Sequence, residues 1–329
     1  MPATEPLLRV DDLHVSFPTD HGIVNAVRGI SWSVDAGETL VIVGESGSGK
    51  SVSITAVAGL LPRNAMVEGS VRFQGIDPLA LKGRALREYR AEKVGLVFQD
   101  PLTALNPCFT VGDQIAEIFR VHRNLDRKSA WTKAVSLLEA VQIREPERRA
   151  HQYPHELSGG MRQRIVIAMA IALEPPLLLA DEPTTALDTS VRGEVLNIIS
   201  ALRRRMGMGV VLITHDVGVA AAVADRVAVM YAGQIVEIGD AEDVFRRPSH
   251  PYTRALMASM PRLGSTRRLE AIKGLPPSPR EISSGCSFQP RCPIATSRCV
   301  ADDPALTFVE GTTVEAACHY AGPREEASL

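Results

Sequence analysis

The sequence has no long hydrophobic run. Its longest apolar stretch near the middle, Ile165 to Leu173, is nine residues long, whereas a helix needs about 20 apolar residues to cross a bilayer. The first residues, MPATEPLLRVDD, also lack the basic and then apolar layout of a signal peptide. We therefore expect a soluble, cytoplasmic protein without transmembrane helices.

Net charge is nearly absent as well. Lys and Arg together number 36 and Asp and Glu 38, which leaves a net charge of −2. A protein that coats nucleic acid is strongly basic, so no nucleic-acid partner is expected. With 45% hydrophobic and 22% charged residues the composition is that of a globular chain, which excludes a disordered one. At ~150 residues per domain, 329 residues suggest about two domains.

Cysteine is scarce and unevenly placed. Of the five cysteines, Cys108 stands alone and the other four follow residue 285. A disulfide framework needs an oxidising compartment, and nothing in the sequence exports the chain. The four cysteines near the C-terminus are therefore considered as candidate ligands of a cofactor.

Short strand-like runs and helical segments alternate along most of the chain, which is typical of an α/β fold. A mostly helical, more charged segment lies at about 107–175, and the texture changes to Pro, Ser, Arg and Cys beyond Pro261. We predict an ATPase domain at 1–262 and a small irregular extension at 263–329. The predicted strands are 8–17, 26–34, 39–43, 68–75, 93–100, 177–181 and 210–216, with a hairpin at 226–240.

One strand–loop–helix unit has the pattern of a phosphate-binding loop. The buried-type strand TLVIV is followed by GESGSGKS, which fits G-x-x-x-x-G-K-[ST]. Glycines let backbone N–H groups turn toward phosphates, and the helix N-terminus adds positive potential. Lys50 would reach the β- and γ-phosphates of ATP, and the Ser51 hydroxyl would bind Mg²⁺. The loop residues are Gly44, Glu45, Ser46, Gly47, Ser48, Gly49, Lys50 and Ser51.

A second apolar strand, LLLAD, ends in two acidic residues. The carboxyl ends of strands are where α/β sheets bind ligands. Asp181 can hold the Mg²⁺ shell there, and Glu182 can orient or deprotonate a water that attacks the γ-phosphate.

The segment Leu157-Ser158-Gly159-Gly160-Met161 resembles the signature motif of ABC ATPases, with Met161 in place of the usual Gln. The change leaves the backbone and serine donors intact. Ser158, Gly159 and Gly160 open a helix from Met161 onward, which makes another anion-binding N-terminus. In the family this motif contacts the nucleotide held by the opposing subunit, so the resemblance implies a dimer that sandwiches ATP.

Other family markers follow in order. Gln99 resembles the Q-loop glutamine that contacts Mg²⁺ or the water, Ala186-Leu187-Asp188 resembles the D-loop, and His215 resembles the switch histidine. Phe17 matches the aromatic that stacks on adenine, although an ordinary strand aromatic is an alternative. The resemblance also places Val52 at the nucleotide. It implies a P-loop ATPase core with an antiparallel β part and a helical subdomain.

The C-terminal part narrows the resemblance to the ATP-binding subunits of dipeptide, oligopeptide and nickel importers. HPYTRAL at 250–256 is followed by four cysteines, spaced C-x5-C-x6-C-x18-C. In that subfamily such cysteines hold a [4Fe-4S] cluster, and this spacing is not the paired C-x2-C usual for structural zinc. Zinc or free cysteines remain alternatives. The implied cluster ligands are Cys286, Cys292, Cys299 and Cys318.

The resemblance implies an ATPase subunit that powers peptide import and lies on the cytoplasmic side of the inner membrane. The implied partners are a second, paralogous ATPase subunit, two transmembrane permease subunits and an extracytoplasmic binding protein. Import of nickel or another small solute is the alternative substrate. A soluble ABC ATPase acting on DNA or ribosomes is less favoured, because the chain has one cassette and no long coiled coil. A redox protein with an accessory ATPase is also less favoured.

Overall fold

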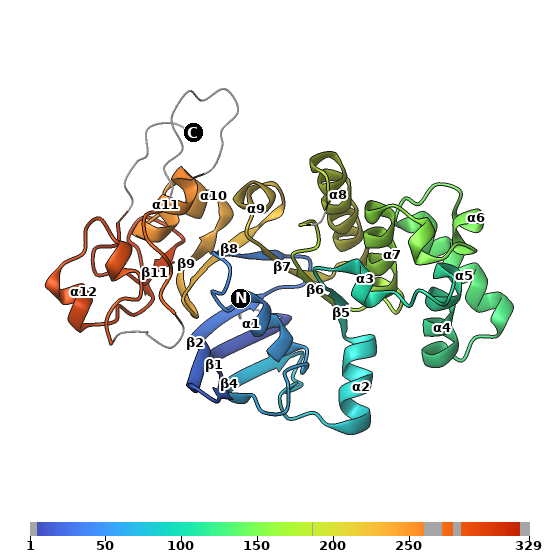
Figure 1. The fold of residues 1–329 in the computed structure, drawn as a ribbon, viewed down its shortest axis with the longest axis horizontal. Coiled ribbons are helices and arrows are strands. Elements are labelled where there is room, and N and C mark those ends of the chain that lie inside the picture. Colours follow the sequence, from blue (N-terminus) through green and yellow to red (C-terminus); the bar gives the residue numbers. More distant parts are fainter. Residues whose placement is uncertain (1–4, 186, 260–271, 279–283, 323–329) are drawn as a thin grey trace. The chain divides into compact units, whose positions relative to one another are not determined.

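The chain divides into two units, one of them assembled from three separate stretches of sequence (Figure 1). The first unit comprises residues 1–34, 39–79 and 213–329, and the second comprises residues 35–38 and 80–212. The computed structural model describes residues 5–185, 187–259, 272–278 and 284–322. The boundary predicted at residue 262 lies outside the described residues.

The first unit contains an antiparallel sheet of three strands. β1 (Leu8–Thr19) pairs with β2 (Gly22–Val34) on one side and with β4 (Met66–Phe73) on the other. Leu13 and Val15 of β1 are fully buried, whereas His14 between them is exposed. This alternation is the pattern from which a half-buried strand was predicted.

A second set of strands in this unit carries the predicted hairpin. β3 (Thr39–Val43) is buried throughout and runs parallel to β8 (Arg226–Tyr231). β8 turns back into β9 (Gln234–Asp240) through Ala232 and Gly233, which both have positive φ, at 46° and 84°. Positive φ at both central residues gives the turn the twist that a two-residue hairpin needs. The hairpin prediction is confirmed.

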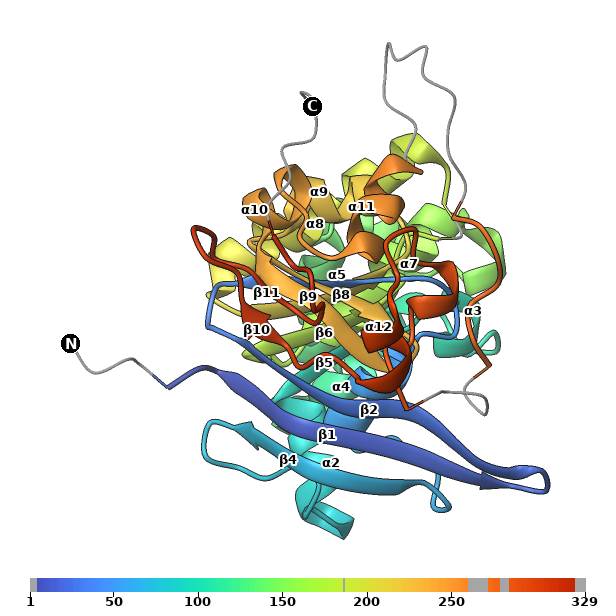
Figure 2. The ribbon, with the colours of Figure 1, turned by 90° about the vertical axis from the view of Figure 1, so that its left-hand side faces the viewer.

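The C-terminal residues extend this sheet, which the sequence did not predict. β11 (Glu315–Ala316) pairs with β9, and β10 (Thr307–Phe308) pairs with β11. The strands are only two residues long, so alternation could not reveal them. Figure 2 shows β10 and β11 beside β9.

The described helices of the first unit are α1 (Lys50–Val57), α9 (Val217–Val223), α10 (Ala241–Arg246), α11 (Pro251–Ala258) and α12 (Ser297–Ala301), with a 3-10 turn η2 (Gln289–Arg291).

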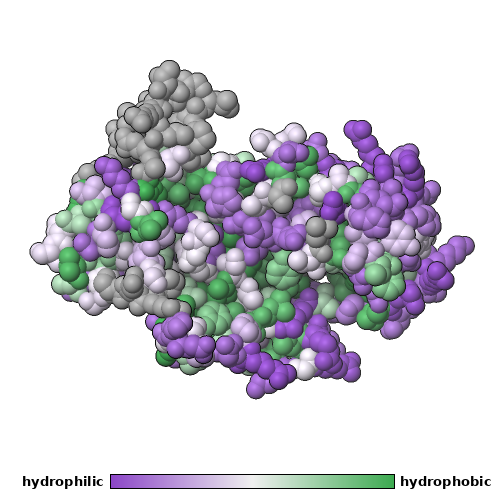
Figure 3. Space-filling view, in the orientation of Figure 1, coloured by the Kyte–Doolittle hydropathy of each residue, from purple (hydrophilic) through white to green (hydrophobic). Residues whose placement is uncertain are grey.

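The second unit combines parallel strands with most of the helices. β5 (Val94–Val97) runs parallel to β6 (Leu177–Asp181), which also neighbours β7 (Gly209–Thr214). Hydrophilic side chains dominate the visible face of α5 and α6 (Figure 3). The helices are α2 (Gly83–Glu92), α3 (Pro101–Ala104), α4 (Val111–Arg123), α5 (Arg127–Ala140), α6 (Pro146–Ala150), α7 (Gly159–Ile171) and α8 (Thr189–Met206), with a 3-10 turn η1 (Pro154–Glu156).

These elements form a mixed α/β fold, as predicted. The helices α4 to α7 occupy the segment that was expected to be helical. Among the described residues no helix has both the length and the apolar character needed to cross a membrane.

Candidate functional site

The loop between β3 and α1 has a shape that only glycine allows at two positions. A Cβ atom at Gly44 would lie 2.1 Å from the carbonyl oxygen of Met230. At Gly49, which has a φ of 100°, a Cβ would lie 2.3 Å from the carbonyl oxygen of Ala26. Because both obstacles are backbone atoms, they cannot turn aside as a side chain could. The glycines thus allow neighbouring backbone to lie close to the loop, and loops of this glycine-rich kind bind phosphate through their backbone N–H groups.

Lys50 is folded into this loop. Its side chain is 5% exposed, and its Nζ donates to the carbonyl oxygens of Gly44 and Glu45, both at 2.8 Å. Ser51 is exposed on the first turn of α1, and that turn contains no acidic residue. The positive end of the helix dipole therefore favours an anion here.

Three further predicted residues lie in the first unit. Phe17 is half-buried on β1, opposite Val24 of β2. His215 is exposed and directly follows β7, where Asp216 caps α9 by accepting bonds from the N–H groups of Gly218 and Val219. Val52 is half-buried on α1.

The second unit brings Gln99 and Glu182 together. Glu182 follows β6 with a φ of 45°, which is unusual for a residue with a side chain and costs energy. Its Oε2 accepts a bond from Thr185 Oγ1 at 2.8 Å and a long one from Gln99 Nε2 at 3.4 Å. Asp181 is the last residue of β6. The strained backbone and the two donors fix one carboxylate, as a group that orients a water requires. Thr185 was missed in the sequence because it has no fixed motif.

The signature segment caps helix α7. Ser158 is exposed, and its Oγ accepts a bond from the N–H of Met161 at 3.3 Å. The helix begins at Gly159, two residues before the predicted start, because Ser158 serves as the N-cap. A Cβ at Gly160 would lie 2.5 Å from Cγ1 of Val191 on α8.

A cavity of about 750 Å³ adjoins this helix start. Ser158 and Gly160 line it together with three arginines and two glutamates, and one of these arginines, Arg164, pairs with Glu194. Charges of both signs therefore line the cavity. Asp188 is the N-cap residue of α8. Its D-loop neighbour Ala186 lies outside the described residues.

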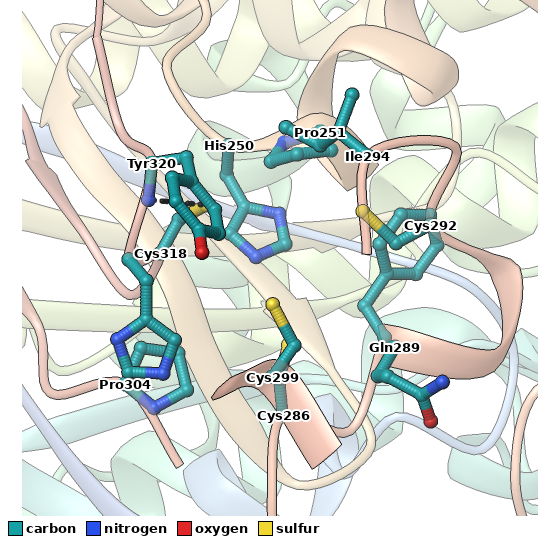
Figure 4. A pocket seen from close by; sticks show the side chains of 12 residues that line it. His250, Pro251, Cys286, Gln289, Cys292, Ile294, Cys299, Pro304, Cys318 and Tyr320 are labelled. Carbon is teal, nitrogen blue, oxygen red and sulfur yellow. Dashed lines mark hydrogen bonds between the residues drawn. The ribbon is translucent and has the colours of Figure 1, made fainter. Parts of the chain in front are cut away.

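The four C-terminal cysteines line one small cavity in the first unit. Figure 4 shows the sulfur atoms of Cys292, Cys299 and Cys318 turned into the same space, beside the ring of His250. Cys286 lines the cavity as well, and its N–H donates to the carbonyl oxygen of Cys299 at 2.9 Å. The volume is about 10 Å³, room for about one water.

Three of these sulfurs share a local pattern. The N–H two residues further along the chain donates to the sulfur in each case, for example Tyr320 N to Cys318 Sγ at 3.4 Å. Burial raises the pKa of Cys286 to about 11 and also raises the pKa values of Cys292 and Cys318. As bare thiols they keep their protons at neutral pH, so binding a metal would release protons.

The cavity collects four cysteine side chains, several of whose sulfurs accept an N–H. Cysteine thiolates are, in general, the ligands that iron–sulfur clusters take. Within the described ranges no three His, Cys, Asp or Glu side chains stand close enough to bind one metal ion. The present volume of about 10 Å³ would not hold a four-iron cube.

Comparison with known proteins matches this combination of features. Residues 27–185 match the ABC transporter family, and residues 236–299 match the oligopeptide/dipeptide transporter C-terminal region. The oligopeptide transport ATP-binding protein OppD of Haemophilus influenzae is 45% identical over 307 residues, which cover 93% of this chain and 95% of that protein. OppD of Mycobacterium tuberculosis is 51% identical over 95% of this chain but only 52% of that protein. The chain thus spans about half the length of that mycobacterial relative.

A solved dimeric ATP-binding cassette, bound to ADP and Pi in a post-hydrolysis state, has the same fold. It superimposes with a TM-score of 0.64 at 28% identity and covers 71% of this chain and 98% of its own. The chain belongs to the ATP-binding proteins of ABC transporters. Within them it belongs to the group whose cassette is followed by the oligopeptide/dipeptide transporter C-terminal region.

Proposed function

We propose that this chain binds and hydrolyses ATP to power an ABC importer of di- and oligopeptides. The observation that carries the proposal is Glu182, held at a positive φ and bonded to Gln99 and Thr185 directly after a buried strand. The glycine-dependent loop that ends in Lys50 supports it. The C-terminal region, matched at 236–299, supports peptides as the substrate class.

In the proposed reaction the loop residues and Lys50 bind the phosphates of ATP. Phe17 would stack on the adenine, and Ser51, Gln99 and Asp181 would hold Mg²⁺, which when bound would screen the phosphate charge. Glu182 accepts the proton of the attacking water, and His215 contacts the γ-phosphate. The roles match the residue types: donors and a cation bind the phosphates, and carboxylates bind the metal and take up the proton.

The site is completed by a second ATPase subunit. Ser158, Gly159 and Gly160 would bind the γ-phosphate held by that subunit, with Asp188 beside them, because the capped start of α7 is exposed and a helix N-terminus favours an anion. Two bound ATP molecules then close the pair, and hydrolysis reopens it. We infer that the second subunit is a paralogue, and that the pair acts with two permease subunits and an extracytoplasmic binding protein. The chain would lie on the cytoplasmic face of the membrane.

Reconstitution tests the transport function. The chain, its partner ATPase, the permease pair and the binding protein are placed in proteoliposomes, and ATP turnover is measured with peptide-loaded binding protein. We expect peptide to stimulate turnover and to accumulate inside the vesicles. Stimulation by nickel with no response to peptide would contradict the substrate class, and turnover without any solute uptake would contradict transport.

We also propose that Cys286, Cys292, Cys299 and Cys318 hold a [4Fe-4S] cluster. Their convergence on one cavity and their N–H donors support it. When bound, the cluster would cross-link the C-terminal extension at 263–329, here called the tail. Its binding would therefore also stabilise the folded state. No predicted catalytic motif lies in the tail, so we assign the cluster a structural or regulatory role.

Elemental analysis after anaerobic purification distinguishes the metals. We expect about four irons and four sulfides per chain, with a brown colour. One zinc and no iron would show that the four thiols bind a different metal. Neither metal would leave them as free cysteines and overturn the proposal.

A further inference from the structure

One ion pair joins the tail to the phosphate-binding loop. Arg291 grips the carboxylate of Glu45 with two parallel bonds, Nη1 to Oε2 at 2.7 Å and Nη2 to Oε1 at 3.0 Å. The Arg291 side chain is 5% exposed and the Glu45 side chain 25%. The two residues are 246 positions apart in the sequence, so no local sequence motif predicts the pair. A two-pronged pair of this kind, shielded from water, is strong and fixes geometry.

Arg291 is itself held in place from several sides. Its Nε donates to the carbonyl oxygen of Lys273 at 3.0 Å, and its Nη1 also donates to the hydroxyl of Tyr231 at 3.2 Å. The guanidinium carbon lies 5.8 Å from the centre of the Tyr231 ring. Because its other N–H groups are bonded to Lys273 and Tyr231, Arg291 presents its guanidinium to Glu45 in one orientation.

Glu45 has further attachments besides its carboxylate. Its backbone N–H donates to the hydroxyl of Tyr252 at 3.0 Å, and its carbonyl oxygen accepts from Lys50 Nζ at 2.8 Å. Tyr252 is fully buried on α11, with its ring centre 5.4 Å from that of Phe288 in the tail. Glu45 thus contacts Arg291, Tyr252 on helix α11, and Lys50 of the phosphate-binding loop.

Arg291 also directly precedes one of the pocket cysteines. It is the last residue of the η2 turn, and Cys292 is the residue that caps this turn. Any rearrangement that opens the pocket around Cys292 acts on the segment that carries Arg291. Loop and pocket are therefore connected by one short chain of contacts.

We propose that Arg291 is a positioning residue for ATP binding, which acts through Glu45 and ties the phosphate-binding loop to the cysteine pocket. The inference rests on the proposed ATP-binding role of the loop. Without Arg291, Glu45 would place an uncompensated negative charge in the loop that receives the phosphates, and the loop would lose a fixed point. By reciprocity, bound nucleotide must also alter the pocket.

Nucleotide titration of the full-length chain tests this. The affinity for a fluorescent ATP analogue with Mg²⁺ is measured for wild type, Arg291→Gln and Arg291→Lys, well below their unfolding temperatures. We expect Arg291→Gln to weaken binding about tenfold, as for the loss of one partner of a buried charge pair. Arg291→Lys should recover part of the affinity, because it keeps the charge but not the fork. The matched control is Arg298→Gln, an exposed arginine of the same tail, which should bind like wild type.

A double variant separates charge compensation from tail packing. Glu45→Gln combined with Arg291→Gln should bind the analogue several-fold more tightly than Arg291→Gln alone, because the uncompensated carboxylate is gone. Equal affinities of wild type and Arg291→Gln would overturn the proposal. So would a double variant no better than Arg291→Gln. A wild-type chain that bound no nucleotide would instead refute the proposed ATP-binding function.

The link to the pocket has its own readout. Hydrogen–deuterium exchange of the backbone around Cys292 is followed by mass spectrometry with and without the Mg²⁺-bound analogue, with the backbone around exposed Cys108 as the internal reference. In wild type we expect nucleotide to slow exchange around Cys292 several-fold and to leave exchange around Cys108 unchanged. In Arg291→Gln, at a saturating analogue concentration, the protection should disappear. The same protection in both proteins would show that Arg291 does not carry the connection.

Discussion

The phosphate-binding loop and the cysteine pocket belong to the same unit but are built differently. The loop consists of consecutive residues, and its shape follows from backbone contacts at Gly44 and Gly49. The pocket gathers four cysteine side chains spread over residues 286–318, among them Cys292 at the end of η2 and Cys299 on α12, and its shape depends on what this segment packs against. The sequence of a continuous motif predicts both the residues of a site and their geometry. For a site formed by packing of distant segments, the sequence predicts only which residues could take part.

The packing that shapes the pocket centres on Phe288. This side chain is 1% exposed and lies against the rings of Tyr231, Tyr252 and His250, with ring centres 5.3 to 5.9 Å apart. Burying a phenylalanine contributes roughly 2 to 3 kcal/mol. The segment around Phe288 is therefore attached to the rest of the first unit by a hydrophobic contact, although it has little regular structure.

The largest effect should come from one residue of a continuous motif. Glu182→Gln is expected to reduce ATP turnover of the assembled complex by at least about 100-fold, because it removes the proton acceptor for the water. ATP binding should persist, since the amide keeps an oxygen for Thr185. Lys50→Ala should lose binding as well, because it removes the cation that pairs with the phosphates. Turnover of Glu182→Gln at the wild-type rate would contradict the assignment of the base.

A glycine pair within the loop provides a sharper contrast. Gly49→Ala should destabilise the protein by at least about 2 kcal/mol and abolish tight nucleotide binding, because its Cβ would meet the carbonyl of Ala26. Gly47→Ala is the matched control: Gly47 also has a positive φ, 79°, but a Cβ there meets no atom within 4 Å. It should cost about 1 kcal/mol of backbone strain. Thermal unfolding and nucleotide titration measure both, and equal effects would show that strain, not the close approach, matters.

Replacing one cysteine of the pocket should affect ATP turnover less than it affects the iron content and the stability of the tail. Cys299→Ser is expected to lose the iron and to lower the unfolding temperature by several degrees, because the cross-link is gone. Cys108→Ser, at an exposed position in the second unit, should retain both. Iron content and thermal unfolding are the measurements. Full iron content in Cys299→Ser would remove Cys299 from the ligand set.

Much of the fold was predictable because its signals are local. β3, β6 and the hairpin at Ala232-Gly233 follow from apolar runs and one turn. The same holds for the loop and for the acid at the end of β6. α11 begins with Pro251, a residue that is common at the first position of a helix.

Long-range contacts were not predictable. HPYT at 250–253 gave no hint that Tyr252 holds the backbone of Glu45, or that His250 lines the cysteine pocket. The pairing of β11 with β9 and the ion pair of Arg291 likewise join segments far apart in sequence. Each depends on the folded positions of both partners, which neither partner's neighbouring residues encode.

The smallest effect is expected on the pH dependence of stability, through the buried side chains of Glu237 on β9 and His250, the N-cap residue of α11. The carboxylate of Glu237 accepts bonds from the N–H groups of Ser249 and His250, at 2.7 and 2.8 Å. Burial raises the pKa of Glu237 from 4.5 to about 7 and lowers the pKa of His250 from 6.5 to about 3. Between about pH 4.5 and 7 the folded state keeps the Glu237 proton that the unfolded state releases, so stability falls as pH rises. Between about pH 3 and 6.5 the unfolded state gains a proton on His250 that the folded state refuses, so stability rises with pH.

The two contributions should therefore cancel between about pH 4.5 and 6.5. Each alone amounts to at most about 1.4 kcal/mol per pH unit. We expect Glu237→Gln to leave the His250 contribution, so that its free energy of unfolding rises with pH relative to wild type. His250→Asn keeps an acceptor for the N–H of Tyr252 and should show the opposite slope. Urea unfolding at several pH values across this range measures the slopes. Because the slope and not the absolute stability is compared, a general loss of stability in either variant does not imitate the result, whereas parallel profiles for all three proteins would contradict both pKa shifts.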